Sequence, residues 1–214
     1  MFWWDGALTD PSTRVYMQFN GYYASCDGPG SGSIGQVVTT VADFPNGWSP
    51  MSADPLIQRP PAMQWLYEPD IVRDPVSGTF YDFSNGGDAD GNNVIAYFTA
   101  SSIKGPWTYQ GIALTTSQQW ERGGELQNPQ VWQDAHGLWI MIFGADARGP
   151  LIGLAVSSDL VHWTQLSDNP VSVSTTRNTY LPRIVSDSGG IYWMLSGPNN
   201  KAGTGIYLDR SIGR

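Results

Sequence analysis

The sequence contains little charge and a single cysteine. Lys, Arg, Asp and Glu make up 14% of its 214 residues, and Cys26 has no partner in the chain with which to form a disulfide. No run of 18 apolar residues occurs, and the first residues, MFWWDGALTDP, lack the basic start and apolar core of a signal peptide. We therefore expect no membrane span, while the compartment stays open, an extracellular or virion-associated location included.

Basic residues are the scarcest charged group. The chain has 11 Lys and Arg against 19 Asp and Glu, which gives a net charge of −8, and its basic residues form no cluster. An acidic chain of this kind is a poor binder of nucleic acid, whose phosphates attract clustered cations. A neutral ligand such as a carbohydrate fits this composition better.

Aromatic residues and turn-forming residues are abundant instead. The sequence has ten Trp, ten Tyr, 25 Gly and 15 Pro, and it shows no sustained helical periodicity. This composition is typical of many short strands joined by tight turns.

Four similar stretches follow one another along the chain. They are WWDGALTDPSTRVYMQFNG, LYEPDIVRDPVSGTFYDFSNGG, LQNPQVWQDAHGLWIMIFGA and YLPRIVSDSGGIYWMLSGP. Each contains a short apolar strand, a turn built on Asp with Gly, Ser or Pro, and an aromatic strand that ends in glycine. A third alternating strand follows, and in the first three repeats a tryptophan begins a fourth. The expected turns lie at Asp10-Pro11, Asp74-Pro75, 134–137 and 187–190.

This repeat predicts an all-β fold, a β-propeller of four-stranded antiparallel blades. We expect one domain over residues 1–214, with repeats at about 1–60, 61–122, 123–176 and 177–214, the last of which is incomplete. A β-sandwich explains neither the fixed strand order nor the recurring tryptophan. About three and a half blades are present, so either another segment or subunit completes the ring or the propeller is incomplete. A homo-oligomer or a partner chain at the open blade is therefore expected.

Several motifs resemble one family of enzymes. The stretches EPDIV, ASSIKGPWTYQGIAL, NPQVW and GLAVSSDLVHWTQLSDNPV are similar to the five-bladed propeller glycosidases, family 43 first and families 32 and 68 second. The resemblance implies an inverting hydrolase in which successive blades supply the carboxylates. By position in the repeats, Asp5 resembles the base, Asp70 the aspartate that tunes the pKa of the acid, and Glu125 the acid.

The strand WLYEPDIVRDP carries more acid than a buried strand normally does. If residues alternate along it, Glu68 and Asp70 face a water-filled cleft, whereas Tyr67 and Ile71 pack between blades. Glu68 is therefore a further catalytic candidate, although it could also cap a strand edge, as Asp5 could bind its own turn. Asp74 belongs to an Arg-Asp-Pro triplet like that of family 32, but it falls at a turn and is interpreted as a turn residue.

Candidate sugar-binding residues are mainly aromatic. Trp3, Trp4, Trp65 and Trp120 present faces on which sugar rings can stack, and core packing is the alternative for each. Arg183 follows the proline of the fourth repeat, where no carboxylate stands, and is a candidate contact to substrate.

We expect no cofactor. A calcium ion is the one metal considered, in the loop GGDADGNN through Asp88, Asp90 and Asn92, which a long hairpin turn explains as well. His136 and His162 lie near turns and are interpreted as structural. Two functions from different classes stay open: a glycosidase acting on an arabinan-like or xylan-like polysaccharide, and a carbohydrate-binding or structural propeller without catalysis, such as a surface or virion adhesin.

Overall fold

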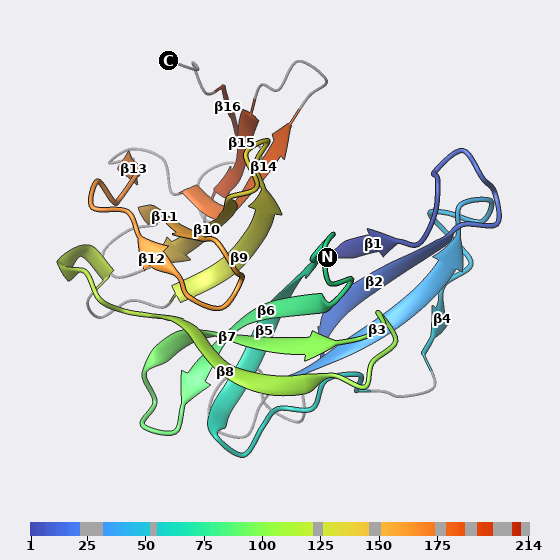
Figure 1. The fold of residues 1–214 in the computed structure, drawn as a ribbon, viewed down its shortest axis with the longest axis horizontal. Helices are drawn as coiled ribbons and strands as arrows, with labels where there is room; N and C mark the ends of the chain where they lie inside the picture. Colours follow the sequence, from blue (N-terminus) through green and yellow to red (C-terminus); the bar gives the residue numbers. More distant parts are fainter. Residues whose placement is uncertain are drawn as a thin grey trace. The chain divides into compact units, whose positions relative to one another are not determined.

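The computed structural model of the chain consists almost entirely of β-strands (Figure 1). It describes residues 1–21, 32–51, 55–121, 126–145, 151–173, 179–186, 192–198 and 207–210. Within these ranges the only helix is a three-residue 3₁₀ turn, η1 (Gln119–Glu121). The prediction of an all-β chain is confirmed. No helix in the described ranges is long and apolar enough to cross a membrane.

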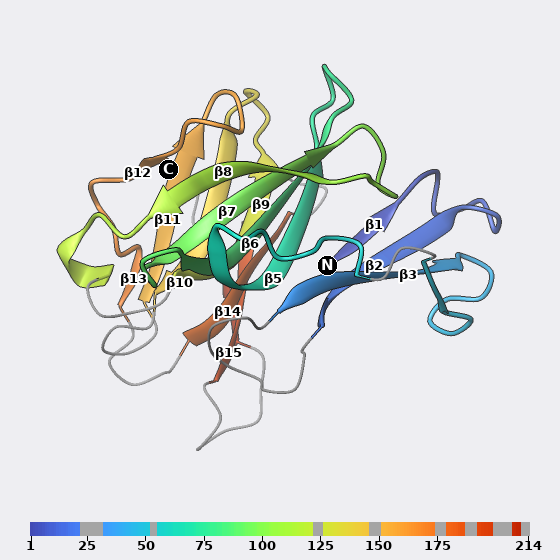
Figure 2. The same ribbon diagram turned by 90° about the horizontal axis from the view of Figure 1, so that it is seen from below.

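The first two sheets each contain four consecutive strands that pair in chain order. Figure 2 shows the strands of the second sheet lying side by side. An up-and-down sheet of this kind forms one blade of a propeller. The strands of the first sheet are β1 (Phe2–Trp4), β2 (Arg14–Gly21), β3 (Ser33–Thr40) and β4 (Ser49–Pro50), and those of the second are β5 (Met63–Arg73), β6 (Phe80–Asp88), β7 (Asn93–Ala100) and β8 (Thr108–Thr115).

The third sheet has one strand more than predicted. Its short strand β12 pairs only with Ala155 and Val156 of β11, and the extra strand β13 pairs with the free remainder of that edge at Leu151 and Ile152. The strands of this sheet are β9 (Leu126–Gln133), β10 (Trp139–Ala145), β11 (Leu151–Ser157), β12 (Thr164–Gln165) and β13 (Ser172–Val173).

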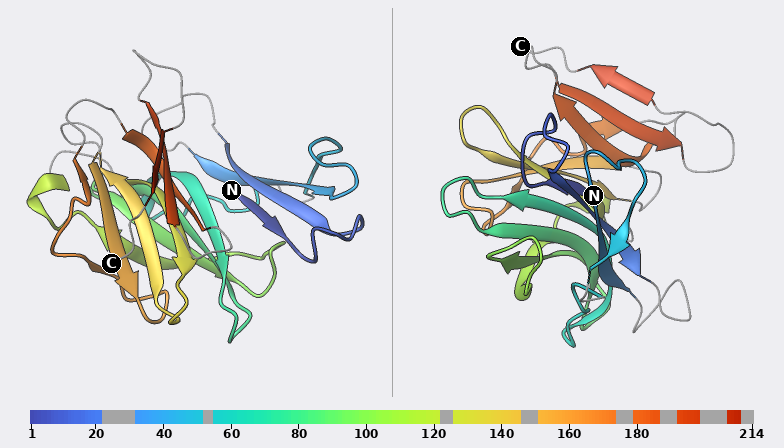
Figure 3. Two further views of the ribbon diagram at one scale, coloured as in Figure 1. Left: turned by 90° about the horizontal axis from the view of Figure 1, so that it is seen from above. Right: turned by 90° about the vertical axis from the view of Figure 1, so that its right-hand side faces the viewer.

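The fourth sheet contains three described strands (Figure 3). They are β14 (Thr179–Ser186), β15 (Tyr192–Pro198) and β16 (Tyr207–Arg210). The first strand of every sheet (β1, β5, β9 and β14) lies at one edge of that sheet, which is the position of the innermost strand in a blade.

The aspartate turns form where the sequence predicts them. Asp10, Asp74 and Asp134 lie between the first two strands of their sheets, and their carboxylates accept hydrogen bonds from backbone N–H groups two to four residues later. The fourth expected turn, at 187–190, lies outside the described residues.

The chain divides into two compact units. One comprises residues 1–92 with 96–112, and the other comprises residues 93–95 with 113–214. In the first unit, Tyr16 of β2 packs in one buried cluster with Ile71, Phe80 and Ile103. Trp3 of β1 meets Phe80 edge to face, with ring centroids 5.3 Å apart. Ile71 therefore packs between the first two sheets, as predicted.

Candidate active site

The first strand of the second blade contains a β-bulge at Glu68-Pro69. Between the pairs made by Tyr67 and Asp70, these two residues of β5 stand opposite one residue of β6, Ser84. The backbone φ of Glu68 is 55°, in the left-handed region that side-chain-bearing residues seldom adopt. Bulges re-aim the neighbouring side chains and are frequent beside active sites. The bulge therefore makes this part of β5 a candidate site.

The same irregularity recurs in the next two blades. In β9 it falls at Asn128-Pro129 and in β14 at Leu181-Pro182, again where two residues face one. Asn128 repeats the left-handed conformation, with a φ of 51°. Glu68, Asn128 and Leu181 therefore occupy equivalent positions, and only the second blade has a carboxyl there. The residues after each proline are likewise equivalent: Asp70, Gln130 and Arg183.

The bulge changes the orientation that strict alternation predicts for β5. Glu68 is half-buried, but the side chain of Asp70 is completely buried. The prediction that Asp70 lines a water-filled cleft is therefore wrong. The prediction fails because the bulge adds an extra residue, which breaks the two-residue period of the strand between positions 68 and 70.

Glu68 is held by neighbours on two strands. Its backbone N–H donates to the side-chain oxygen of Asn20 on β2 at 2.7 Å. In the amide orientation that satisfies its surroundings, Asn85 of β6 donates to Glu68 Oε2 at 3.1 Å and to the Tyr67 carbonyl at 2.9 Å. The carboxyl of Glu68 is thus positioned rather than free to rotate in solvent.

Sequence analysis missed a second buried acid, Asp82 of β6. Its side chain is completely buried, and the Ser84 hydroxyl donates to its Oδ1 at 2.6 Å. Among the described residues, its Oδ2 has no hydrogen-bond partner. Burial raises the pKa of Asp82 to about 7; the Ser84 hydrogen bond lowers this pKa and the nearby charge of Asp70 raises it further. A signal exists in the sequence, because Asp82 is an acid between the aromatic residues Tyr81 and Phe83 of a predicted strand.

Asp5 lies just after β1 and closes the first hairpin. Its Oδ1 accepts the backbone N–H of Arg14 at 2.9 Å, and its Oδ2 accepts the Tyr16 hydroxyl at 3.2 Å. Asp5 is exposed, so its carboxylate stays accessible to a ligand while it supports the hairpin. Both interpretations of this residue, base and turn support, are compatible with these contacts.

The predicted acid, Glu125, lies outside the described residues. Four residues earlier, the buried Glu121 of η1 accepts the backbone N–H groups of Ser117 and Gln118 through Oε2, both at 2.7 Å. Within the described part of the chain, its Oε1 has no hydrogen-bond partner. Glu121 therefore holds the loop that precedes it, and no sequence motif distinguished it.

The two candidate tryptophans of the first unit have different surroundings. Trp4 is 47% exposed and lines a depression of about 330 Å³ together with apolar residues. Among the described residues, the lining side chains carry no polar group except the indole N–H of Trp4, so this depression provides little hydrogen bonding for sugar hydroxyls. Trp65 is half-buried and its ring covers Gly87 of β6, where a Cβ atom would lie 2.5 Å from the ring. The lining residues of the depression are Phe2, Trp4, Leu8, Val15, Val41 and Phe44.

The two candidate sugar-binding residues of the second unit, Trp120 and Arg183, make packing and hydrogen-bond contacts within the protein. Trp120 stacks on Phe143 of β10, with ring centroids 6.0 Å apart, and its indole N–H donates to the side chain of Gln118. The guanidinium of Arg183 donates to the backbone carbonyl of Asn128 at 3.2 Å, across neighbouring blades. These contacts fit the core-packing alternative for Trp120, and they place Arg183 at the bulge of the third blade.

The loop considered for calcium is a self-contained turn. The carboxylate of Asp88 accepts the backbone N–H groups of Asp90 and Asn92 at 2.9 and 2.8 Å, and the side-chain amide of Asn92 at 2.9 Å. In the described ranges, no group of three or more His, Cys, Asp or Glu side chains is placed to hold a metal ion.

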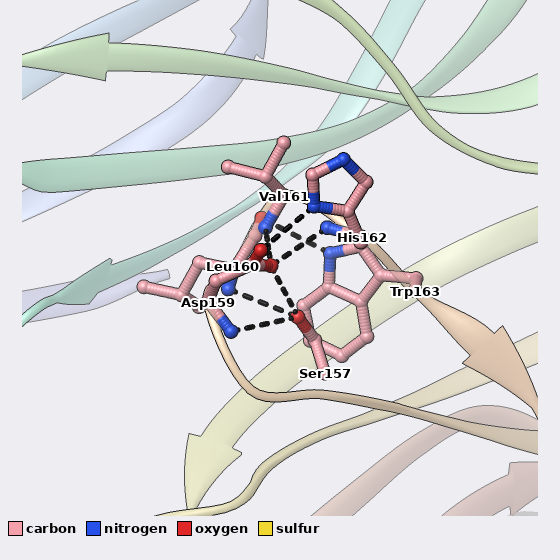
Figure 4. A network of polar contacts seen from close by, with 6 residues as sticks. All are labelled: Ser157, Asp159, Leu160, Val161, His162 and Trp163. Atoms are coloured by element: carbon pink, nitrogen blue, oxygen red, sulfur yellow. Dashed lines mark hydrogen bonds and ion pairs between the residues drawn. The ribbon is translucent and has the colours of Figure 1, made fainter.

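His162 takes part in a polar network at the turn after β11 (Figure 4). Its Nδ1 lies 2.7 Å from Asp159 Oδ2, and the Ser157 hydroxyl lies 3.1 Å from Asp159 Oδ1. Ser and His thus both bond to the aspartate rather than to each other, unlike the arrangement that activates a nucleophilic serine. These contacts fit the interpretation of His162 as structural.

Comparisons with known proteins agree with the repeat pattern. No protein-family model matches the chain. The probable arabinan endo-1,5-alpha-L-arabinosidase A of Aspergillus fumigatus is 28% identical over 161 residues, which cover 66% of this chain and 47% of that protein. The arabinan endo-1,5-alpha-L-arabinosidase A of Aspergillus niger is 28% identical over 137 residues, covering 59% and 40%. The chain thus spans less than half the length of these relatives.

Solved structures show the same fold. A thermostable family-43 glycoside hydrolase superposes with a TM-score of 0.70 at 18% identity, over 92% of this chain and 67% of that one. The native Bacillus subtilis arabinanase Arb43A gives 0.64 at 15% identity, over 94% and 69%. The chain therefore has the blade fold of the family 43 propeller glycosidases, and the resemblance seen in its sequence is confirmed.

Proposed function

We propose that the protein is a glycoside hydrolase that acts on an arabinan-like polysaccharide. One observation carries this proposal: the sequence similarity to arabinan endo-1,5-alpha-L-arabinosidases, which extends over about two thirds of this chain. The propeller blades and the acids at the start of successive repeats support it. Neither the low content of basic residues nor the net charge of −8 conflicts with a neutral polysaccharide substrate.

The proposed mechanism is inverting hydrolysis by two carboxyl groups with a third in support. Asp5 activates water as the base, and Glu125 protonates the leaving oxygen as the acid. Asp70 is completely buried, so in this proposal it acts on the acid through its charge and does not touch substrate. Glu68, the half-buried carboxyl at the bulge, is the alternative acid.

A specific observation favours the second candidate function, a carbohydrate-binding or structural propeller without catalysis. Of the three equivalent bulge positions, one holds the carboxyl of Glu68 and the others hold Asn128 and Leu181. The repeated bulge therefore supplies a carboxyl from one blade of the three, which is compatible with a propeller that binds carbohydrate without cleaving it.

The two functions are separated by assays on linear 1,5-α-arabinan and on xylan. The hydrolase proposal expects arabino-oligosaccharides to be released by the wild type and their release to fall at least a hundredfold in Asp5→Asn. The Asn side chain can still accept the N–H of Arg14, so the hairpin should remain folded. Asp10→Asn, an exposed turn acid of the same hairpin, is the matched control and should retain full activity.

Glu125→Gln and Glu68→Gln identify the acid. The variant that lacks the acid should lose most activity on arabinan and much less on an aryl arabinoside, because an activated leaving group needs less protonation. If the wild type binds arabinan without cleaving it, and none of these variants alters binding, the hydrolase proposal fails and the non-catalytic function stands.

A further inference from the structure

A second cleft has a lining that includes none of the candidate carboxylates among the described residues. Its volume is about 480 Å³, within the range of small-ligand sites. One wall is the segment 55–61, which leads from the first sheet to the second, and the other is formed by β7, the turn after it and the start of β8. The lining residues are Pro55, Leu56, Ile57, Gln58, Arg59, Pro60, Pro61, Phe98, Lys104, Pro106, Trp107 and Tyr109.

The first wall is fixed to both neighbouring sheets. Ile57 forms a two-way backbone bridge with Ile34 of β3, with N–O distances of 3.0 and 3.1 Å. The guanidinium of Arg59 donates to the carbonyls of Pro60 and Met63, where β5 begins. These hydrogen bonds therefore fix the segment and hold the guanidinium of Arg59 in place.

The second wall is fixed by a tight turn. The backbone N–H of Gly105 donates to the Ser102 carbonyl at 2.8 Å, and that of Lys104 to the Ser102 hydroxyl at 3.2 Å. Trp107 packs partly against the buried cluster around Tyr16. The backbone of this turn is thus held while the side chain of Lys104 is exposed.

The chemistry of the lining is unusual for so acidic a chain. Among the described residues, the lining contains the cations Arg59 and Lys104 and no carboxylate, although acids outnumber bases 19 to 11 in the whole sequence. Half-buried Trp107 and Tyr109 supply flat apolar surface and a hydroxyl, and exposed Gln58 supplies an amide. Aromatic faces suit the C–H faces of sugar rings, amides and hydroxyls bind sugar hydroxyls, and cations bind carboxylates.

We propose that this cleft binds an oligosaccharide that carries carboxylates, a chain of uronate sugars. Trp107 and Tyr109 contact sugar rings, and Lys104 with Arg59 pairs with the sugar carboxylate. A proline-rich peptide is the competing ligand, because prolines and aromatics can pack together. The two cations favour the acidic sugar, since a proline-rich segment gives them nothing to pair with. The proposal does not depend on hydrolysis at the other site.

The test is a binding titration of the intact protein with a galacturonic acid trisaccharide, and with neutral arabinotriose at the same concentrations. The uronate should shift the indole N–H resonance of Trp107 in NMR spectra, and the neutral sugar should bind more weakly. Lys104→Gln should weaken uronate binding about three- to fivefold, as expected for an exposed ion pair. Arg73→Gln removes an exposed cation elsewhere in the second sheet and should leave the affinity unchanged.

Raising the salt concentration should weaken binding of the uronate by the wild type more than by Lys104→Gln. The proposal is overturned if the uronate does not bind or binds no better than arabinotriose. It also fails if Lys104→Gln and Arg73→Gln behave alike, or if a proline-rich peptide displaces the uronate from Trp107 with higher affinity. Binding is measured without turnover, so loss of hydrolysis in the Asp5 variant does not affect the result.

Discussion

Ionisation of a carboxyl group that is buried in a sheet costs free energy, because few groups in the interior replace the water that hydrates the charge. Asp82 reduces this cost by keeping its proton up to about neutral pH. The neutral form also removes the repulsion that a second charge beside Asp70 would create. Asp82 therefore contributes to the fold of the second blade and, being completely buried, is out of reach of a substrate.

This raised pKa predicts how stability depends on pH. An unfolded Asp loses its proton near pH 4, whereas folded Asp82 loses it near pH 7. Between these values the folded state holds the extra proton, so the free energy of unfolding should fall by about 1.4 kcal/mol per pH unit as pH rises. Asp82→Asn should remove this slope, which urea unfolding at pH 4.5, 6 and 8 would measure.

Asp90→Asn, in an exposed turn of the same sheet, is the control and should retain the wild-type pH dependence. A wild-type slope that persists in Asp82→Asn would mean that another group carries the proton.

Part of the candidate site could be predicted from the residue types in the sequence, and part of it could not. The turn role of Asp74 followed from its place beside proline, a local effect that one short stretch contains. The burial of Asp70 did not follow, because it depends on the bulge and on β6, which pairs with it from more than ten residues away. Asp82 is also an acid within a predicted apolar strand, but no motif of the resembling family includes it.

At the scale of elements, the bulge is the feature that three blades share. An X-Pro pair interrupts the pairing of β5, β9 and β14 at the same place, and proline fits there because it has no N–H to offer to the ladder. The left-handed residue before it is Asn in the third blade, a type that tolerates this conformation, and Glu in the second, which does not favour it.

The bulge predicts an order of stability at position 68. Glu68→Gly and Glu68→Asn should stabilise the fold by up to about 1 kcal/mol through relief of backbone strain, whereas the β-branched Glu68→Val should cost about 1–2 kcal/mol. Thermal unfolding of the three variants tests this order, with Glu68→Gln as the control that keeps the shape and removes the charge. Equal stability of the Val and Asn variants would show that φ at this position is not the constraint.

The turn after β11 gives a prediction at low pH. Asp159 accepts the backbone N–H groups of Val161 and His162 at 2.9 and 2.8 Å, and its contact with His162 holds its pKa well below the usual range. Because Asp159 is exposed and water screens its contacts, Asp159→Ala should cost no more than about 0.5–1 kcal/mol at neutral pH. Because a lowered pKa stabilises the fold only while the acid is ionised, this difference should shrink below about pH 4. Denaturant midpoints at pH 3 and 7 measure it, with Asp168→Ala as an exposed control.

The order of strands and turns could be predicted from the sequence, because each strand or turn is specified by a short stretch of residues. Strands start and end where the apolar alternation and the Asp turns place them, and each predicted tryptophan precedes its fourth strand: β4, β8 and β12. The fifth strand of the third sheet could not be predicted from the sequence. β13 exists because short β12 leaves Leu151 and Ile152 unpaired, and two residues carry no period by which a strand is recognised.

At the scale of the whole molecule, the first sheet is apolar on both faces. Trp3, Tyr16 and Val38 pack toward the second sheet. On the alternate positions, Phe2 is 44% exposed and Trp4 47% exposed, and Phe44 beside them is 49% exposed. An antiparallel sheet that meets water normally has one polar face, so an exposed apolar patch of this kind favours association.

Self-association through this patch of the first sheet, a different place from the open last blade at which a partner is predicted, is testable. We expect sedimentation velocity to show concentration-dependent self-association of the wild type, which the double substitution Phe2→Ser and Phe44→Ser should weaken at least tenfold. Val76→Ser is the control, because Val76 is 92% exposed in a turn and stands apart from the patch. The net charge of −8 opposes contact between copies, so moderate salt should strengthen association through screening of the repulsion. A wild type that remains monomeric at every concentration and salt level would exclude self-association and leave a different chain as the partner.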